Sequence, residues 1–179
     1  GCFHACRAEF QDRGGRQETI PGTPLPAEIP LEMLLRRNRV PTYSTMTYRR
    51  GLVAEFPAWH RGLRCGDWGL HCLHAAAGPL GFLPEPMTLY RVHAQGMWSG
   101  QPLGTRLQEF FTVWSELDAH FAGRYHEAIE EGRRELLGEI SREYADLKRI
   151  ESRYHALGLD RIAGLFRSAR RFWNRESAD

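Results

Sequence analysis

The chain has 179 residues, 42% of them hydrophobic and 26% charged, and its formal net charge at pH 7 is +2. This composition is typical of a folded globular protein and excludes a disordered one. The small net charge does not indicate a nucleic-acid-binding protein, and no run of about 18 apolar residues predicts a membrane span. The four cysteines match neither a zinc-site spacing nor a secreted disulfide framework, so we expect reduced thiols and a cytoplasmic protein.

The first half of the chain predicts a mixture of strands and short helices. Residues 2–10 predict a buried strand. Four prolines within residues 21–30 exclude a helix or a central strand there. Residues 31–37 predict a short helix with its leucines facing inward, and residues 42–48, rich in Thr and Tyr, predict a strand.

A helix and two further strands follow. Asp67 is expected to begin a helix over residues 68–77. Short strands are predicted at 81–83 and 87–92, with the Pro-Glu-Pro sequence at 84–86 turning the chain between them. Together with the earlier elements they predict an α/β fold.

The pattern changes to helical near residue 102. Hydrophobic residues then recur three and four positions apart through residues 103–121 and 137–157. We therefore expect two parts, an α/β part over residues 1–102 and a helical tail over residues 103–179.

A third helix is predicted from Asp160 onward, with basic and aromatic residues on it. Its arginines are Arg161, Arg167, Arg170, Arg171 and Arg175. Basic charge with aromatics at helical spacing can rest on an anionic membrane, which suggests peripheral contact with the inner face of the membrane. The alternative, a solvated amphipathic helix packed on the body, stays open.

Asp67 is the candidate catalytic residue. A carboxylate at a junction between a loop and a helix is fixed by the backbone and still open to a cleft, as a general base must be. The alternative is that Asp67 only caps the helix, because Asp is a favoured N-cap residue.

The segment from Tyr90 to Ser99 holds candidate binding residues. Arg91 and His93 would share one face of the predicted strand. A guanidinium can grip a diphosphate, and a neutral imidazole can bind a phosphate or a divalent ion, so His93 is also a candidate metal ligand. Trp98 and Ser99 could stack on and hydrogen-bond a sugar. The alternatives are a solvated strand end and, for Trp98, a packing anchor.

Two weaker signals accompany these residues. Thr42 and Ser44 lie in the predicted hydroxyl-rich strand and could line an acceptor site, although Thr is simply a good strand former. His71 and His74 lie three residues apart on the predicted helix and are interpreted as residues of a helix face rather than as a metal pair.

Three segments in this order resemble family 2 glycosyltransferases of bacteria. Residues 38–50, NRVPTYSTMTYRR, are similar to the strand-and-turn segment that precedes the acceptor region. Gly66-Asp67-Trp68 resembles the acidic motif whose aspartate is the usual general base. Tyr90 to His93 with Trp98 and Ser99 resembles the closing segment of the family's catalytic domain.

The resemblance implies a GT-A fold and an inverting sugar transfer in polysaccharide biosynthesis. It implies a nucleotide-sugar donor, a saccharide or lipid-linked hydroxyl acceptor, and Mg²⁺ or Mn²⁺. Asp67 would be the base, with Arg91, His93, Trp98, Ser99, Thr42 and Ser44 around the substrates. The family's D-x-D motif does not occur, and the chain opens at Gly1 in a strand entered in mid-fold. We therefore expect a C-terminal half that is inactive alone, or, as the alternative, a non-catalytic helical interaction or membrane-surface module.

Overall fold

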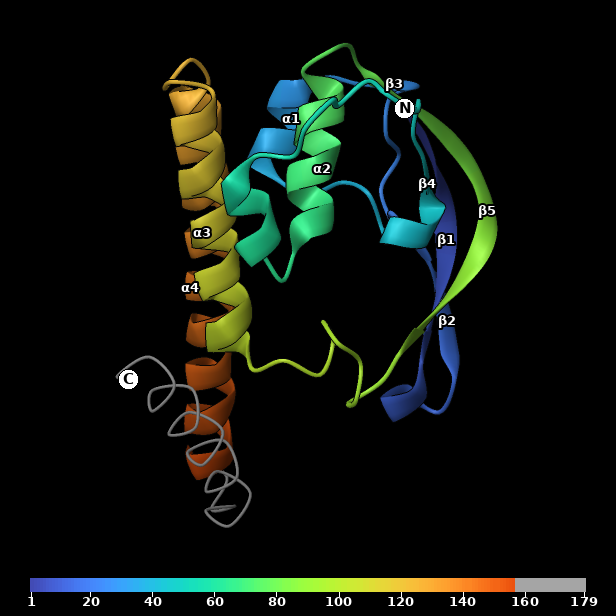
Figure 1. Ribbon diagram of the computed structural model, residues 1–179. Coiled ribbons are helices and arrows are strands. Elements are labelled where there is room, and N and C mark those ends of the chain that lie inside the picture. Colours follow the sequence, from blue (N-terminus) through green and yellow to red (C-terminus); the bar gives the residue numbers. More distant parts are fainter. Residues whose placement is uncertain (157–179) are drawn as a thin grey trace.

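Residues 1–156 are described by the computed structural model, and they form a mixed α/β fold (Figure 1). A twisted sheet forms one layer, two short helices pack against it, and a long helical hairpin lies on the other side of these helices. Within the described residues, no helix is both long enough and apolar enough to cross a membrane.

The sheet is mixed and open. Its strands are β1 (Cys2–Phe10), β2 (Arg16–Ile20), β3 (Glu28–Ile29), β4 (Met46–Thr47) and β5 (Leu80–Val92). The order is β2-β1-β5-β3, and β4 also pairs with β1. The central strands β1 and β5 run parallel, and every other pair is antiparallel. The predicted first strand is confirmed, and the short β3 lies at the sheet edge, where the proline-rich stretch can be accommodated.

The prediction of two separate strands at 81–83 and 87–92 is wrong, because β5 is one strand. Its register against β1 shifts at the prolines: Leu83 pairs with His4, whereas Thr88 pairs with Cys6. Proline cannot donate to the ladder, so the chain bulges at this point and then resumes the same pairing.

The predicted strand over residues 42–48 is also mostly wrong. A 3-10 turn, Tyr43–Thr45, precedes the two residues of β4. The Thr45 hydroxyl and backbone N–H both donate to the carbonyl of Thr42, at 2.8 and 3.0 Å. Such local hydrogen bonds of Thr compete with the strand ladder, which strand propensity does not take into account.

Four helices complete the described chain: α1 (Leu31–Arg36), α2 (Gly66–Ala75), α3 (Leu103–His120) and α4 (His126–Ala156). The inward face predicted for the first helix is confirmed, since Leu31, Leu34 and Leu35 are buried. The predicted third tail helix and its arginines lie outside the described residues.

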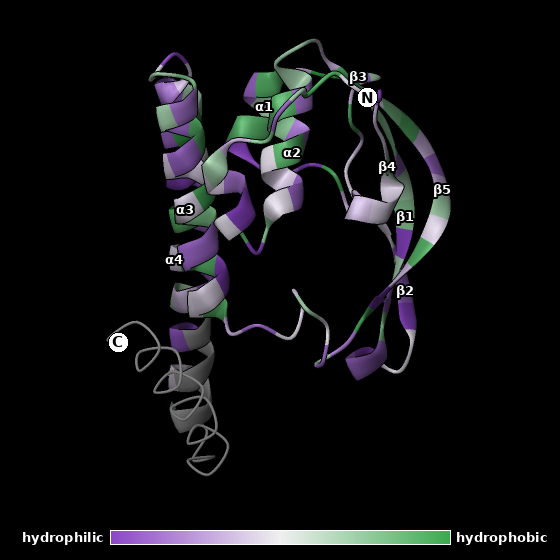
Figure 2. Cartoon of the chain, viewed as in Figure 1, coloured by the Kyte–Doolittle hydropathy of each residue, from purple (hydrophilic) through white to green (hydrophobic). Residues whose placement is uncertain are grey.

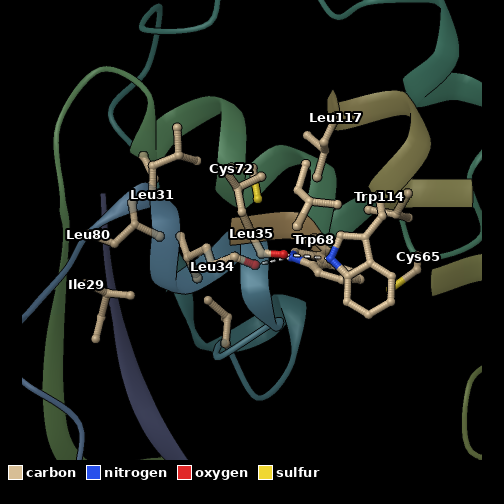
Figure 3. Packing of buried hydrophobic residues seen from close by; sticks show 14 of the residues in the cluster. Ile29, Leu31, Leu34, Leu35, Cys65, Trp68, Cys72, Leu80, Trp114 and Leu117 are labelled. Carbon is tan, nitrogen blue, oxygen red and sulfur yellow. Dashed lines mark hydrogen bonds between the residues drawn. The ribbon is translucent and has the colours of Figure 1, made fainter. Parts of the chain in front are cut away.

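Two tryptophans join α1 to its neighbours in the core (Figure 3). The indole N–H of Trp68 donates to the Leu34 carbonyl at 2.7 Å, and that of Trp114 donates to the Leu35 carbonyl at 2.6 Å. Both carbonyls belong to the last turn of α1, where they have no partner within the helix. One buried cluster therefore contains residues from both sides of residue 102. Figure 2 shows α1 as mainly hydrophobic and the α3–α4 hairpin as mixed, with many hydrophilic residues.

Gly132 is where α4 crosses α1. A Cβ added at Gly132 would lie 2.8 Å from both the carbonyl carbon and the Cα of Arg36. This obstacle is backbone, so no side-chain rotation can relieve it. We expect Gly132→Ala to lower the free energy of unfolding by about 1–3 kcal/mol, measured by urea denaturation.

Gly138 provides the matched control on the same helix. A Cβ there would meet only the end of the Arg142 side chain, at 3.8 Å. Gly138→Ala should therefore stabilise the protein by up to about 1 kcal/mol through helix propensity. Equal effects of the two substitutions would contradict the close crossing.

Candidate functional site

Asp67 lies in the first turn of α2 and is half-buried. The helix begins at Gly66, with Cys65 at the N-cap position. The prediction that Asp67 begins the helix is therefore wrong by one residue. Oδ1 of Asp67 accepts the backbone N–H of Trp68 at 2.8 Å and the thiol of Cys65 at 3.3 Å. A carboxylate in the first turn is also favoured by the helix dipole.

Tyr90 of β5 is half-buried and close enough to Asp67 for its phenol to feel the carboxylate charge. Burial raises the pKa of its phenol, and the charge of Asp67 raises it further. Successive strand residues point to opposite faces, so Arg91 lies on the other face, where it is exposed. The structure therefore does not bring Arg91 and Asp67 together. The strand ends at Val92, so the alternation does not extend to His93.

The loop over residues 93–100 is tightly folded. The Ser99 hydroxyl donates to the carbonyl of His93 at 2.8 Å, and the backbone N–H of Gly96 donates to the same carbonyl at 2.9 Å. A Cβ at Gly96 would collide with the Ser99 hydroxyl. The Ser99 hydroxyl therefore donates its proton within the loop, and its oxygen can still accept a hydrogen bond.

Trp98, in the same loop, packs against Phe110 of α3, with ring centroids 5.3 Å apart. This contact agrees with the packing role that the sequence left open for Trp98. A sugar-stacking role for the half-buried ring stays a prediction.

Thr42 precedes the turn before β4 and Ser44 lies within that turn, so the two residues do not share a strand. Thr42 is half-buried and Ser44 is exposed, whereas the buried hydroxyl of this segment is that of Thr45. The charge of Asp67 acts on this segment at Tyr48. Burial raises the pKa of Tyr48, and the charges of Tyr43 and Asp67 raise it further.

Tyr48, which is half-buried, and the buried His71 and His74 form a cluster that the sequence pattern did not predict. The Tyr48 ring stacks on His71 at 6.1 Å and tilts against His74 at 4.5 Å. Among the described residues, Tyr48 Oη, His71 Nε2 and His74 Nδ1 have no hydrogen-bond partner. His71 Nδ1 lies 3.3 Å from Asn38 Oδ1. The spacing of the two histidines was visible in the sequence, but their shared partner Tyr48 was not.

Acid should weaken the fold through His71. Burial lowers the pKa of His71 from 6.5 to about 4, outweighing the charge of Asp67 that favours the protonated ring. The unfolded chain therefore binds this proton at a higher pH than the folded chain does. Stability should fall as pH decreases from about 6.5 to about 4, by roughly 3 kcal/mol from this group, and this loss should stop below that range.

Urea unfolding across this pH range measures the effect, with His71→Gln as the comparison because glutamine stays neutral. Between pH 6.5 and 4 the wild-type protein should lose more unfolding free energy than His71→Gln does. A constant difference would contradict the interpretation of His71 as a buried neutral ring.

The described residues do not contain a group of three or more His, Cys, Asp or Glu side chains placed to hold a metal ion. Mg²⁺ or Mn²⁺ therefore stays a prediction, and so does His93 as its ligand. A cavity of about 80 Å³ lies between the helices, beside Asn38, Trp68 and Trp114, and an open depression lies over residues 54–61. Asp67 lines neither of them.

No protein-family model matches the chain, and no solved structure matches it. Uncharacterized proteins from Mycobacterium bovis and Mycobacterium tuberculosis are 34% identical to it over 97 residues. The match covers 54% of this chain and 27% of each relative, so the chain spans about a quarter of the length of the curated relatives it matches.

Proposed function

We propose that this chain is the acceptor-side part of an inverting glycosyltransferase with a GT-A fold, similar to family 2. Asp67 takes the proton from an acceptor hydroxyl as the oxygen attacks the anomeric carbon of a nucleotide sugar. The bond from that carbon to the diphosphate oxygen breaks, and the nucleoside diphosphate leaves. Attack from the opposite face inverts the sugar carbon.

The geometry of Asp67 carries the proposal. Both hydrogen bonds that the described residues give this carboxylate fall on Oδ1. The other oxygen, Oδ2, is left to accept a proton, and the side chain is half-buried rather than sealed in the core. A fixed and accessible carboxylate is what a general base requires.

The groups around Asp67 support this role because they stay uncharged. Phenols are protonated at neutral pH, and the raised pKa values of Tyr48 and Tyr90 move both groups further from ionisation. The lowered pKa of His71 keeps its ring neutral. Asp67 thus has neutral neighbours, which do not neutralise the base.

The donor diphosphate needs cationic or hydrogen-bonding partners other than Asp67. Arg91 and His93 remain candidates for the diphosphate, but Arg91 lies on the face away from Asp67. The described residues do not form an evident ion site. We expect other parts of the natural polypeptide to hold the nucleotide and the divalent ion.

The test is nucleoside diphosphate release by the natural polypeptide that contains this chain. It would be incubated with UDP-, GDP- and dTDP-sugars, Mg²⁺ or Mn²⁺, and saccharide or lipid-linked acceptors. Acceptor-dependent release, with an inverted anomeric centre in the product by NMR, is the expected result. Failure to release or bind any of these nucleotides would overturn the proposal and favour the non-catalytic interaction module.

A further inference from the structure

A chain of two hydrogen bonds connects α3 to the candidate base. Oε1 of Glu109, on α3, accepts the backbone N–H of Cys65 at 2.8 Å. The Cys65 thiol donates to Oδ1 of Asp67 at 3.3 Å. Cys65 is the N-cap residue of α2 and only 8% exposed. Glu109 is 44 positions from Cys65 in the sequence, and its hydrogen bond connects α3 to the start of α2, where Asp67 lies.

The Cys65 thiol acts as a donor in this arrangement. Burial raises the pKa of the thiol, and the neighbouring charges of Asp67 and Glu109 raise it further. A thiol in these surroundings keeps its proton at neutral pH. It therefore attracts the Asp67 carboxylate, whereas a thiolate would repel it.

Two donors on one oxygen fix the rotation of the Asp67 carboxyl group. The backbone N–H of Trp68 is the second donor to Oδ1, at 2.8 Å. We infer that Cys65 and Glu109 are positioning residues for Asp67: Glu109 fixes the backbone at Cys65, and the thiol fixes the orientation of the carboxylate. The kinetic consequence rests on the proposed function, whereas the hydrogen bond itself can be measured without it.

Cys72 separates positioning from simple packing. It lies on the same helix as Asp67, its side chain is fully buried, and burial raises the pKa of its thiol. Cys72→Ala removes a buried thiol from α2 without touching the Asp67 carboxylate. If Cys65 served only to fill the core, Cys65→Ala and Cys72→Ala should have the same consequences.

The direct test is the S–H stretching band in the infrared spectrum of the 179-residue chain. The band lost in Cys65→Ser is that of Cys65. We expect this band to move to higher wavenumber and weaken in Asp67→Asn, because a neutral amide accepts a weaker hydrogen bond than a carboxylate. The band lost in Cys72→Ala should not move in Asp67→Asn. A Cys65 band that stays in place overturns the inference.

The kinetic test uses the natural polypeptide and the nucleotide sugar it proves to accept. Cys65→Ala should lower kcat about tenfold and leave KM for the donor within about twofold, because orientation and not binding is lost. Cys65→Ser should restore most of the rate, since its hydroxyl is also a donor. Glu109→Leu should lower kcat, and Glu109→Gln, which keeps an acceptor oxygen, should not.

The outcomes distinguish this inference from the proposed function. An unchanged kcat in Cys65→Ala, or an equal loss in Cys72→Ala, overturns positioning even where transfer occurs. If the wild-type polypeptide does not transfer sugar at all, the proposed function fails, and the infrared shift still decides whether the thiol holds Asp67.

Discussion

Asp67→Asn should reduce sugar transfer by the natural polypeptide about a thousandfold while leaving the protein folded. The amide is the same size as the carboxylate, and its oxygen can still accept the N–H of Trp68 and the thiol of Cys65. It cannot accept a proton at neutral pH. The loss should therefore appear in kcat, measured as release of nucleoside diphosphate, and not in the circular dichroism spectrum.

Asp12→Asn is the matched control for this prediction. Asp12 is exposed in the 3-10 turn after β1, and the same chemical change there should leave transfer unchanged. Transfer by Asp67→Asn at more than about a tenth of the wild-type rate would remove Asp67 from the role of base. Equal losses in the two variants would point to a general effect of removing negative charge.

The elements that the sequence predicted well are those with a strong local pattern. The inward leucines of α1 and the hydrophobic repeat of α3 mark a buried face in the sequence alone. The predictions failed where a single residue type overrode the pattern. Two prolines suggested a break in β5 where the chain only bulges, and the hydroxyl of Thr45 turned a predicted strand into a 3-10 turn.

The candidate base could be found from the sequence, but its surroundings could not. Asp67 stands out through the motif around it and its place next to a helix start. Glu109 and Tyr48 reach the same region from other elements, and nothing in their local sequence marks that contact. Long-range contacts of this kind depend on the packing of α2 between the sheet and α3, which one sequence does not reveal.

Trp68→Ala should be among the most destabilising substitutions in the described chain. The side chain is 1% exposed, and its ring meets those of Trp114 and Phe110 edge-on, at 5.3 and 5.7 Å. Replacing it by alanine leaves a large cavity and an unpaired Leu34 carbonyl. We expect a loss of about 3–5 kcal/mol in the free energy of unfolding. Domains of this size are often stable by only about 5–15 kcal/mol, so the variant should be partly unfolded in mild urea.

Two phenylalanine substitutions separate the hydrogen bond from the packing. Trp68→Phe keeps an aromatic ring but leaves the Leu34 carbonyl without its donor, which should cost about 1–3 kcal/mol. Trp59→Phe removes an indole N–H that has no partner among the described residues. It should therefore lower the free energy of unfolding clearly less than Trp68→Phe does. Urea unfolding followed by circular dichroism measures both, and equal losses would contradict a structural role for the bond to Leu34. The backbone N–H that holds Asp67 is unchanged in Trp68→Phe, so any loss of transfer in that variant should follow from loss of folded protein or from movement of α2.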